Sequence, residues 1–388
     1  MRLDDVCSHI VDCEHKTAPI DEAGEYFAVG TPAMRNHVIN YAEARRISRE
    51  TFETWTRRLA PRPGDLLLAR EAPVGPVVRL PDVANVAPGQ RTVLLRPDPR
   101  VADSTFLYYA LTAPSAQARL QSKAEGSTVH HLNVPDIRSF ELRVPALPEQ
   151  QAIAEVLGAL DDKIAANTAL AARADDYLEA EMDRLTIGCG VTALGAIADV
   201  NRRTVKPVAG GSLRYVDIAS VGVGVFDYPE VSPWDDAPGR ARRAVSYGDT
   251  LWSTVRPNRR SHALVLDEDS LLVASTGLAV LSPREVGFAF LYEATRRPAF
   301  TAYLENVAEG SAYPAVRADR FLNAPVPDVS QVARTAFESV AAPLRKLVAA
   351  QARENRTLAA TRDALLPQLM SGKLRVRDAE KIAADAGA

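Results

Sequence analysis

The feature that most constrains this sequence is an internal repeat in which its second half restates its first. Residues 106–127 aligned with residues 290–311 give eleven identities in 22 positions, and both segments end in AEGS. The same alignment offset, called the repeat offset below, places the Gly-Asp dipeptide at 64–65 on a second one at 248–249. A unit of roughly 190 residues is too long for a solenoid repeat and has the size of a domain with an appendage. The sequence therefore predicts a tandem duplication.

Length and composition predict an ordinary soluble protein with more than one core. The chain has 388 residues, of which 47% are hydrophobic and 24% are charged. No apolar run reaches the ~18 residues that a membrane span needs. The first residues, MRLDDVCSHI, have neither the basic start nor the apolar stretch of a signal peptide. We therefore expect a cytoplasmic protein that does not associate with a membrane.

The cysteines give no sign of a disulfide framework or of a metal site. Cys7, Cys13 and Cys189 are too few and too scattered for a chain of this size, so we expect reduced thiols. His9 and His15 lie near the first two cysteines, but the spacing matches no familiar zinc pattern. We expect a half-buried first strand there, and no metal.

The two copies have the texture of small α+β domains. Residues 1–147 contain short β segments punctuated by Pro and Gly, with one helical run near 103–123. Residues 186–327 repeat this texture, with strand-like segments such as "LRYVDIASVGVGVF" and one matching helix, "VGFAFLYEATRRPAFTAYLEN". We expect two similar domains of mixed small β-sheets and helices.

A long helix is predicted after each domain. Residues 148–185 are Ala-rich, lack an interior proline, and place a seam of residues at alternating steps of four and three. The first seam consists of Ile153, Leu157, Leu160, Ile164, Asn167, Ala171, Ala174, Leu178, Glu181 and Leu185. The repeat offset carries these positions into 328–375, onto Phe337, Ala341, Leu344, Val348, Gln351, Asn355, Leu358, Arg362, Leu365 and Leu369. Residues 376–388 then form a tail.

Two details of these helices leave alternatives open. Asn167 and Gln351 are polar seam residues that either fix register and leave room for a partner, or lie in a solvated part of the helix. Pro343 and Pro367 should kink or end the second helix locally.

Charge predicts that the two helices pair with each other. Residues 148–185 hold nine acidic and three basic side chains, a balance of −6, and residues 328–388 hold seven acidic and ten basic, a balance of +3. Opposite signs favour an intramolecular antiparallel coiled coil, although solvated helix faces would also carry such charges. About 38 helical residues span on the order of 57 Å, which is longer than the ~34–36 Å between major-groove faces one DNA turn apart. A rigid rod of this length with a similar domain at each end would suit the reading of two short DNA elements at a fixed distance.

The motifs together resemble the specificity subunits of type I restriction-modification systems. The resemblance covers the whole chain and rests on the order and duplication of several short motifs. They are the Gly-Asp turns Gly64-Asp65 and Gly248-Asp249, the loop Gly126-Ser127-Thr128, the helix-start segment "VPALPEQQAIAEVLGALDDKI" (144–164) and "LLPQLMSGKLRV" (365–376). The second copy departs from the pattern, because Ala312 stands where Thr128 stands and "VPDVSQ" (326–331) replaces "VPALPEQ".

This resemblance implies a fold, a function and a set of partners. It implies two target-recognition domains, each binding one half of a bipartite site on double-stranded DNA, with a spacer set by the two helices. It also implies one copy of the chain per complex, bound to two methyltransferase subunits and to ATP-dependent restriction subunits. S-adenosylmethionine, ATP and Mg²⁺ are then expected on the partners, and no cofactor on this chain.

Motifs for catalysis are missing from the sequence. It contains no phosphate-binding loop of the Gly-x-x-x-x-Gly-Lys-Ser/Thr type and no stretch of the kind that amino-methyltransferases place beside a flipped base. The carboxylates of "LDEDSLL" (266–272) lack the downstream lysine of a nuclease, so we expect a surface loop there. No nucleophile motif accompanies the pair His130-His131. We expect a DNA-recognition subunit without catalysis of its own.

DNA contacts are expected from basic and amide-bearing loops, because the net charge of −3 gives no overall basic footprint. The strongest cluster is "STVRPNRRSH" (253–262), where arginine can bind guanine or phosphate and asparagine can pair with adenine. The candidates are Arg35, Asn36, His37, Arg70, Ser127, Thr128, His130, His131, Asn133, Asn201, Arg202, Arg203, Lys206, Arg256, Asn258, Arg259, Arg260, His262, Ser311, Tyr313 and Arg317. For any single candidate, a solvated charge or a fold-stabilising turn is an equal alternative.

Two other function classes stay open at this point. A coiled-coil scaffold whose two domains bind protein, without DNA recognition, would also suit neutral domains. A nuclease is the other alternative, and the missing motifs argue against it. Salt dependence separates scaffold from DNA reader, because binding to phosphates weakens as salt rises.

Overall fold

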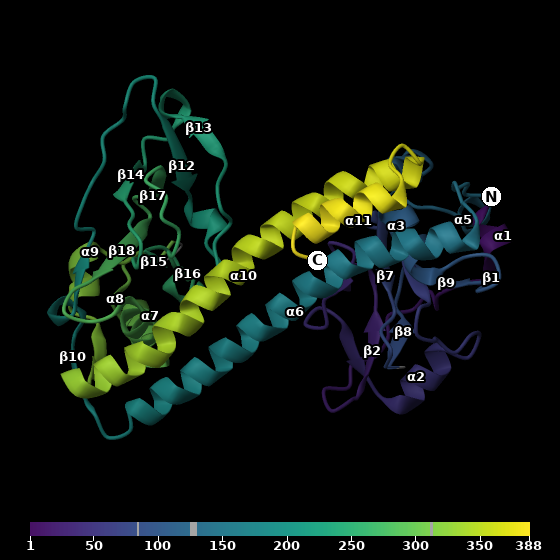
Figure 1. Cartoon of the computed structure of the whole chain (residues 1–388). Coiled ribbons are helices and arrows are strands. Elements are labelled where there is room, and N and C mark those ends of the chain that lie inside the picture. Colours follow the sequence, from purple (N-terminus) through teal and green to yellow (C-terminus); the bar gives the residue numbers. More distant parts are fainter. Residues whose placement is uncertain (84, 125–129, 311–312) are drawn as a thin grey trace. The chain divides into compact units, whose positions relative to one another are not determined.

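The computed structural model describes residues 1–83, 85–124, 130–310 and 313–388 (Figure 1). The chain divides into two compact units. Unit 1 comprises Met1–Ala165 and Glu354–Ala388, and unit 2 comprises Ala166–Arg353. Each unit is described by itself below.

Unit 1 is built around a four-stranded antiparallel sheet. Its order is β1 (Cys7–Asp12), β9 (Thr92–Pro97), β6 (Leu66–Arg70) and β7 (Val74–Arg79). A second sheet has the order β5 (Arg45–Ile47), β2 (Tyr26–Val29) and β8 (Val86–Pro88), with β2 parallel to β8, and a hairpin joins β3 (Met34–Arg35) to β4 (Val38–Ile39). The short helices are α1 (Leu3–Val6), η1 (Thr31–Ala33), α2 (Arg49–Trp55), α3 (Ser104–Thr112), α4 (Pro114–Ser122) and α5 (Val134–Arg138).

Unit 2 has the same plan. Its main sheet has the order β11 (Ala198–Val200), β18 (Leu278–Pro283), β15 (Thr250–Ser253) and β16 (His262–Leu264). The second sheet has the order β13 (Val231–Pro233), β12 (Ser212–Val216), β17 (Leu272–Ser275) and β14 (Ala241–Ala244), again with one parallel pair, β12 and β17, and β10 (Gly190–Ala193) pairs with β19 (Pro325–Asp328). The short helices are η2 (Leu194–Ala196), η3 (Ile218–Ser220), η4 (Trp234–Asp236), η5 (Pro257–Arg259), α7 (Phe288–Arg296), α8 (Pro298–Val307) and α9 (Ala318–Leu322).

The repeat offset of the sequence reappears in the positions of the helices. It carries the first residue of α3 onto that of α7, that of α4 onto that of α8, and that of α5 onto that of α9. It also relates the first residues of the long helices α6 (Leu147–Leu185) and α10 (Gln331–Ser371). Together with the matching order of the main sheets, this agreement confirms two similar α+β domains.

The structure corrects the expected elements in two places. Each helical run, expected as one helix, is two helices, and the second begins at Pro114 or Pro298. Proline has no N–H to continue the first helix but is well tolerated in the first turn of the next. Within the strand-like segment 213–226, the strand β12 ends at Val216, because a 3₁₀ turn and a tight loop follow it.

The second long helix continues past both prolines. Pro343 and Pro367 lie inside α10, so the expectation that they could end the helix is wrong. Both are exposed, and water can therefore satisfy the carbonyl groups that proline leaves unbonded. The segment expected as a tail contains a further helix, α11 (Val376–Asp385), which buries Ala379 and Ala383 in the core of unit 1.

In unit 1, the start of α6 packs antiparallel against the end of α10. Six apolar seam residues meet here and are fully or almost fully buried: Ile153, Leu157, Leu160, Leu358, Leu365 and Leu369. Ile164 is half-buried at their edge, and its carbonyl accepts a hydrogen bond from Asn355. Asp161 joins the two helices to the domain, because its carboxylate accepts a hydrogen bond from Tyr109 of α3 (2.6 Å) and one from Arg362 of α10 (2.6 Å).

In unit 2, the end of α6 packs against the start of α10. Leu178, Phe337 and Ala341 are buried, Leu185 and Leu344 are half-buried against them, and Val348 is half-buried. The pairing of the two long helices that the heptads predict is therefore confirmed in both units.

A buried ionic network fastens the helices of unit 2 to its domain. Arg345 of α10 donates to Glu293 of α7 (2.6 Å) and contacts Asp175 of α6, which also binds Arg296 (2.9 Å). Arg345 occupies the position equivalent to Asp161, and Glu293 the position equivalent to Tyr109. The same structural junction thus carries opposite charge on the long helix in the two units.

The two seam amides for which burial was left open, Asn167 and Gln351, are both buried. Asn167 is 5% exposed and Gln351 is 9% exposed. The alternative that this part of the seam is solvated is therefore wrong for both. Amides buried in a coiled-coil seam favour one register over others, at a cost in stability. Among the described residues, no helix has the length and apolar character needed to cross a membrane.

Candidate nucleic-acid interface

The Gly-Asp dipeptides form a turn that positions a central strand in each unit. Gly64 and Gly248 have φ values of +82° and +85°, a conformation that glycine adopts readily. The Asp65 carboxylate accepts a hydrogen bond from the backbone N–H of Arg62, and the Asp249 carboxylate from that of Ser246, both at 2.8 Å. Both aspartates are buried. The motif therefore shapes the turn and offers no side chain to DNA.

The partners of the two aspartates differ. In unit 1, Arg96 donates two hydrogen bonds to Asp65, at 2.9 and 2.7 Å. The strand register makes Ser282 the counterpart of Arg96 in unit 2. Burial raises the pKa of Asp249 despite hydrogen bonds from Ser282 and Ser246 and the nearby positive charges.

The loop after this strand pairs with the segment that follows AEGS in both units. Glu71 forms a β-bridge with His131, and Val255 forms one with Ala315. Beside these bridges, the N–H of Leu132 donates to the carbonyl of Arg70, and that of Val316 to the carbonyl of Thr254, both at 2.8 Å. The repeat offset relates every one of these positions in unit 2 to its counterpart in unit 1. The fold thus brings together two loops that the sequence predicts as DNA contacts.

In unit 2 this pairing lies beside three arginines, of which Arg259 and Arg260 are exposed and Arg256 is half-buried. The Arg256 guanidinium lies 4.6 Å from the centre of the Tyr313 ring, a cation–π contact that orients it. Arg259 and Asn258 are exposed on the 3₁₀ turn η5. Arg260 is also exposed and donates a hydrogen bond to the carbonyl of Arg296 (2.9 Å).

Two residues at the edges of this group are less available. The exposed Arg317 pairs with Glu309 at 2.9 Å, so its charge is partly neutralised. His262 is 0% exposed, stacks on Trp252 with 4.9 Å between ring centres, and contacts the Arg260 carbonyl through Nδ1. Burial lowers the pKa of His262 to about 4. The prediction that His262 contacts DNA is therefore wrong, because its ring belongs to the core.

The counterpart loop in unit 1 is held by internal bonds. Arg70 ion-pairs with Asp12 (3.3 Å) and donates to the carbonyl of Leu132 (3.2 Å), which leaves 12% of its side chain exposed. Glu71 pairs with Arg91 at 3.2 Å. His131 is half-buried in the bridge to Glu71. Two other predicted residues of this region, His130 and Asn133, are exposed.

A hairpin tip adds the first predicted group of unit 1. Asn36 and His37 form the turn of the β3–β4 hairpin with φ values of +52° and +62°. His37 Nδ1 accepts a hydrogen bond from the N–H of Val77 (3.2 Å), and its backbone carbonyl accepts one from Tyr108 (3.2 Å). Burial lowers the pKa of His37, which favours the neutral acceptor form. His37 thus anchors the tip, while Arg35 and Asn36 are exposed to solvent.

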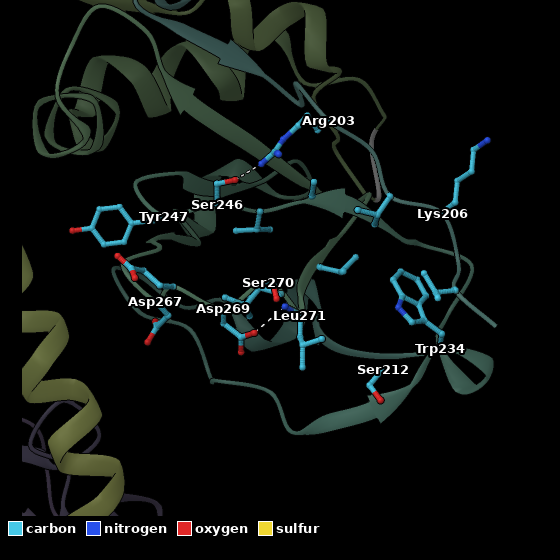
Figure 2. A pocket seen from close by; sticks show the side chains of 17 residues that line it. Arg203, Lys206, Ser212, Trp234, Ser246, Tyr247, Asp267, Asp269, Ser270 and Leu271 are labelled. Atoms are coloured by element: carbon cyan, nitrogen blue, oxygen red, sulfur yellow. Dashed lines mark hydrogen bonds between the residues drawn. The ribbon is translucent and has the colours of Figure 1, made fainter. Parts of the chain in front are cut away.

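The predicted group at 201–206 leads into the second sheet of unit 2. Asn201 has φ +57° and its side chain accepts a hydrogen bond from the N–H of Val280 (3.0 Å), so it is a turn residue. Arg202, Arg203 and Lys206 are exposed. Arg203 and Lys206 line an open hollow of about 870 Å³. Figure 2 shows Lys206 and Trp234 on one side of this hollow, with Tyr247 and Asp267 on the other.

Two of the three carboxylates of segment 266–272, Asp267 and Asp269, are engaged by basic and phenolic groups, and Glu268 is exposed. Asp267 pairs with Arg353 (3.4 Å), and Asp269 pairs with Arg214 (3.0 Å) and accepts a hydrogen bond from Tyr228 (2.6 Å). These contacts explain the acidic run as part of the fold of unit 2.

Among the described residues, one group places possible metal ligands together, namely Asp12, Cys13 and His15. Burial raises the pKa of the Cys13 thiol, which opposes formation of a thiolate ligand. Arg70 already contacts both Asp12 and His15. The group therefore fits an internal ion-pair cluster better than a metal centre.

Some predicted residues cannot be placed. Ser127, Thr128 and Ser311 lie outside the described residues, and so does Ala312. Conversely, the sequence predictions did not include Arg91, which lies beside the bridge region of unit 1 with φ +70°, or the turn at 221–226 in unit 2, where Val223 and Val225 are exposed. The glycines alternating with valine in that loop are the signal of a tight turn that could have revealed it.

Comparisons with known proteins agree with this architecture. Residues 1–174 match the model of the type I restriction modification DNA specificity domain. The predicted family resemblance is confirmed for residues 1–174. The fold of the chain is similar to that of a type I restriction-modification system S subunit from M. genitalium, with a TM-score of 0.64, 18% identity and 95% of each chain covered.

Other comparisons are weaker. The match to the HsdS subunit from Thermoanaerobacter tengcongensis covers 96% of each chain at 18% identity, but its TM-score of 0.35 is too low to support the fold. No curated protein matches the chain in sequence. The specificity-domain match thus describes residues 1–174, and the similarity to the M. genitalium S subunit extends the fold to both units.

Proposed function

We propose that this chain is the DNA-recognition subunit of a type I restriction-modification complex and reads a bipartite site. Each unit binds one half of that site on double-stranded DNA. The single observation that carries the proposal is the loop pairing that recurs in both units, Glu71 with His131 and Val255 with Ala315. A protein that recognises two different half-sites needs the same backbone scaffold in both units, with different side chains on each. The paired loops meet this requirement, because their backbone bridges recur and their residues differ.

Local charge supports binding through the loops. The net charge of the chain is −3, so nonspecific attraction to DNA by the whole protein is weak. In unit 2, Arg256, Arg259 and Arg260 belong to one short segment. Arginine contacts both phosphates and the O6 and N7 atoms of guanine. This segment therefore supplies the strongest predicted contact of unit 2.

The long helices are proposed to set the spacer between the half-sites. α6 and α10 each contribute to both units, and within each unit their seams bury apolar side chains. An equal insertion of one helical turn in both helices should lengthen the spacer of the recognised site without altering either half-site. Partner methyltransferase subunits are proposed to bind the helices, and restriction subunits to join the full complex.

Catalysis is proposed to belong to those partners. In this scheme the methyltransferase subunits carry S-adenosylmethionine, and ATP and Mg²⁺ serve the restriction subunits. The chain itself contributes position and sequence selectivity, and one copy acts in each complex.

Comparison of the host methylome with and without the gene tests the proposal. The expected result is one bipartite motif whose modification disappears with the gene and returns on complementation. An unchanged methylome would contradict the proposal. If the two units bound protein instead of DNA, binding of the purified complex to DNA would show no selectivity for any motif and no steep decline with salt.

A further inference from the structure

Unit 2 presents two exposed valines at the tip of a tight turn. The ends of this turn, Val221 and Phe226, form an isolated antiparallel bridge. Gly224 at the tip has φ +79°, a backbone conformation that a side chain would strain. On either side of it, Val223 is 58% exposed and Val225 is 65% exposed. The turn thus holds two apolar side chains out toward solvent.

The turn is fixed to the edge of the main sheet beside the arginine segment. The N–H of Gly224 donates to the carbonyl of His262, and the N–H of His262 donates to the carbonyl of Gly222, both at 2.8 Å. The buried ring of His262 in turn contacts the carbonyl of Arg260. The valine tip therefore rests on the strand into which the arginine segment leads, and the hydrogen bonds limit its movement.

Unit 1 has a tip at the equivalent edge of its sheet. His262 pairs with Trp252, and Val77 pairs with Leu68, which the repeat offset places on Trp252. His262 and Val77 are therefore equivalent positions. The β3–β4 hairpin is anchored on Val77 through the side chain of His37. Both units thus carry a tip on the same strand position.

The two tips differ in chemistry. In unit 1 the exposed residues are Arg35 and Asn36, which can form hydrogen bonds, together with Val38, which is 60% exposed. In unit 2 the exposed side chains of the tip, Val223 and Val225, have no hydrogen-bonding group. If both tips face DNA, the exposed side chains of the unit 2 tip can contact the bases only through apolar contacts.

We propose that Val223 and Val225 contact the 5-methyl group of thymine in the half-site bound by unit 2. This proposal rests on the proposed DNA-recognition function and names the part of the base pair that the tip reads. Isolated exposed valines are ordinary on protein surfaces. These two are held by backbone hydrogen bonds to His262, two residues after the exposed Arg260 and directly after the segment that carries Arg256 and Arg259. Arginine side chains are attracted to the phosphate backbone, which would bring the tip close to the DNA. The thymine methyl is the apolar group that base pairs display in the major groove.

Replacing thymine by deoxyuridine tests this contact directly, because the change removes only the methyl group. The probe is a duplex carrying the motif found in the host methylome, with each thymine of the unit 2 half-site replaced in turn. Loss of one buried methyl contact should weaken binding of the wild-type complex about fourfold at one or more positions. The double variant Val223→Ser, Val225→Ser should bind more weakly and lose its sensitivity to the replacement at those positions.

Matched controls separate this contact from general effects. Val208→Ser changes another exposed valine of unit 2, 56% exposed, and should keep the sensitivity to deoxyuridine. Replacements in the half-site of unit 1 should affect the wild type and the double variant equally. Both variants change exposed side chains and should leave assembly with the methyltransferase subunits intact.

Several results would overturn the inference while leaving the proposed function standing. They are a unit 2 half-site without any A·T pair, wild-type binding that is indifferent to every replacement, or a double variant that stays fully sensitive. Loss of complex assembly in the double variant would assign the valines to a protein contact instead. Failure of the proposed function itself looks different, because the wild-type complex would then bind the motif duplex no better than a scrambled duplex.

Discussion

Units 1 and 2 share the backbone that positions their loops and differ in the side chains that hold and fill it. The turn around Asp65 is repeated around Asp249 with the same 2.8 Å hydrogen bond, yet an arginine partner in one unit becomes Ser282 in the other. At the helix junction, Asp161 in unit 1 is replaced by Arg345 in unit 2. The comparison teaches that main-chain hydrogen bonds fix the scaffold, while the side chains are free to diverge between half-sites.

Substitutions at the junction between the long helices and the domain should show the largest difference in stability between the two units. Arg345→Met removes one of the two arginine partners of Glu293, which is 3% exposed and keeps only Arg296 at 2.9 Å. Breaking a buried pair from one side typically lowers the free energy of unfolding by about 3–5 kcal/mol. Urea unfolding followed by tryptophan fluorescence would measure this, because Trp234 and Trp252 both lie in unit 2.

The equivalent change in unit 1 should be milder. Asp161 is 30% exposed in its side chain, so Asp161→Asn should lower the free energy of unfolding by about 1 kcal/mol. Equal losses for Arg345→Met and Asp161→Asn would show that burial of the junction does not distinguish the two units.

Substitutions beside the Gly-Asp turns should have the next largest effect on the free energy of unfolding. Arg96→Met removes the arginine that pairs with the buried carboxylate of Asp65, and should lower the free energy of unfolding by about 3 kcal/mol. Ser282→Ala removes one hydrogen bond from Asp249 and should cost about 1 kcal/mol. Chemical denaturation of both variants makes the comparison, and a larger loss for Ser282→Ala would reverse our ranking of the turns.

The arginine segment should affect DNA binding but leave the fold unchanged. The double change Arg259→Ala, Arg260→Ala removes exposed charges and should weaken DNA binding by the assembled complex about tenfold or more, with a shallower dependence on salt. Fluorescence anisotropy with the motif duplex at several salt concentrations measures both effects. Arg49→Ala, an exposed arginine of α2 outside the predicted contacts, is the control and should bind as the wild type does.

The smallest expected effect is a difference in pH dependence. Burial raises the pKa of Asp249 in the folded state, so the folded protein binds this proton more tightly than the unfolded chain does. Relative to Asp249→Asn, the wild type should therefore lose stability as pH rises from about 3.9 through the folded pKa, and show no further change above it. Parallel stability profiles for the two proteins would contradict the direction of this shift.

The pKa of Asp175 is shifted in the opposite direction to that of Asp249. Burial alone would raise the pKa of Asp175, but Arg345 and Arg296 outweigh burial and lower it. Its contribution to stability is therefore present at neutral pH and is lost as pH falls through the folded pKa. The two aspartates of unit 2 thus titrate in opposite senses because one has arginine partners and the other has mainly hydroxyl and amide donors.

The sequence was sufficient for features that repeat with a period. The heptad seam predicted Leu157 and Leu358 as core residues because helical periodicity depends only on local spacing. The internal repeat likewise predicted the second domain from the first. The helix break at Pro298 was missed, although proline chemistry could have revealed it.

The site was harder to predict because burial of a polar residue depends on distant partners. His262 follows exposed arginines in sequence, but its ring stacks on Trp252 in the neighbouring strand. Arg70 resembles a free cation in the sequence, yet the structure pairs it with Asp12, which lies far earlier in the chain. Such pairings follow from strand register, which local sequence patterns do not determine.

The most direct test of the account exchanges one domain and reads the methylome. Residues 1–147 are replaced by the corresponding domain of a similar specificity subunit, and the exchanged chain is expressed with its methyltransferase partners in the host. We expect one half of the modified motif to change while the other half and the spacer stay the same. A motif that stays unchanged, or that changes in both halves at once, would contradict the claim that each unit reads its own half-site.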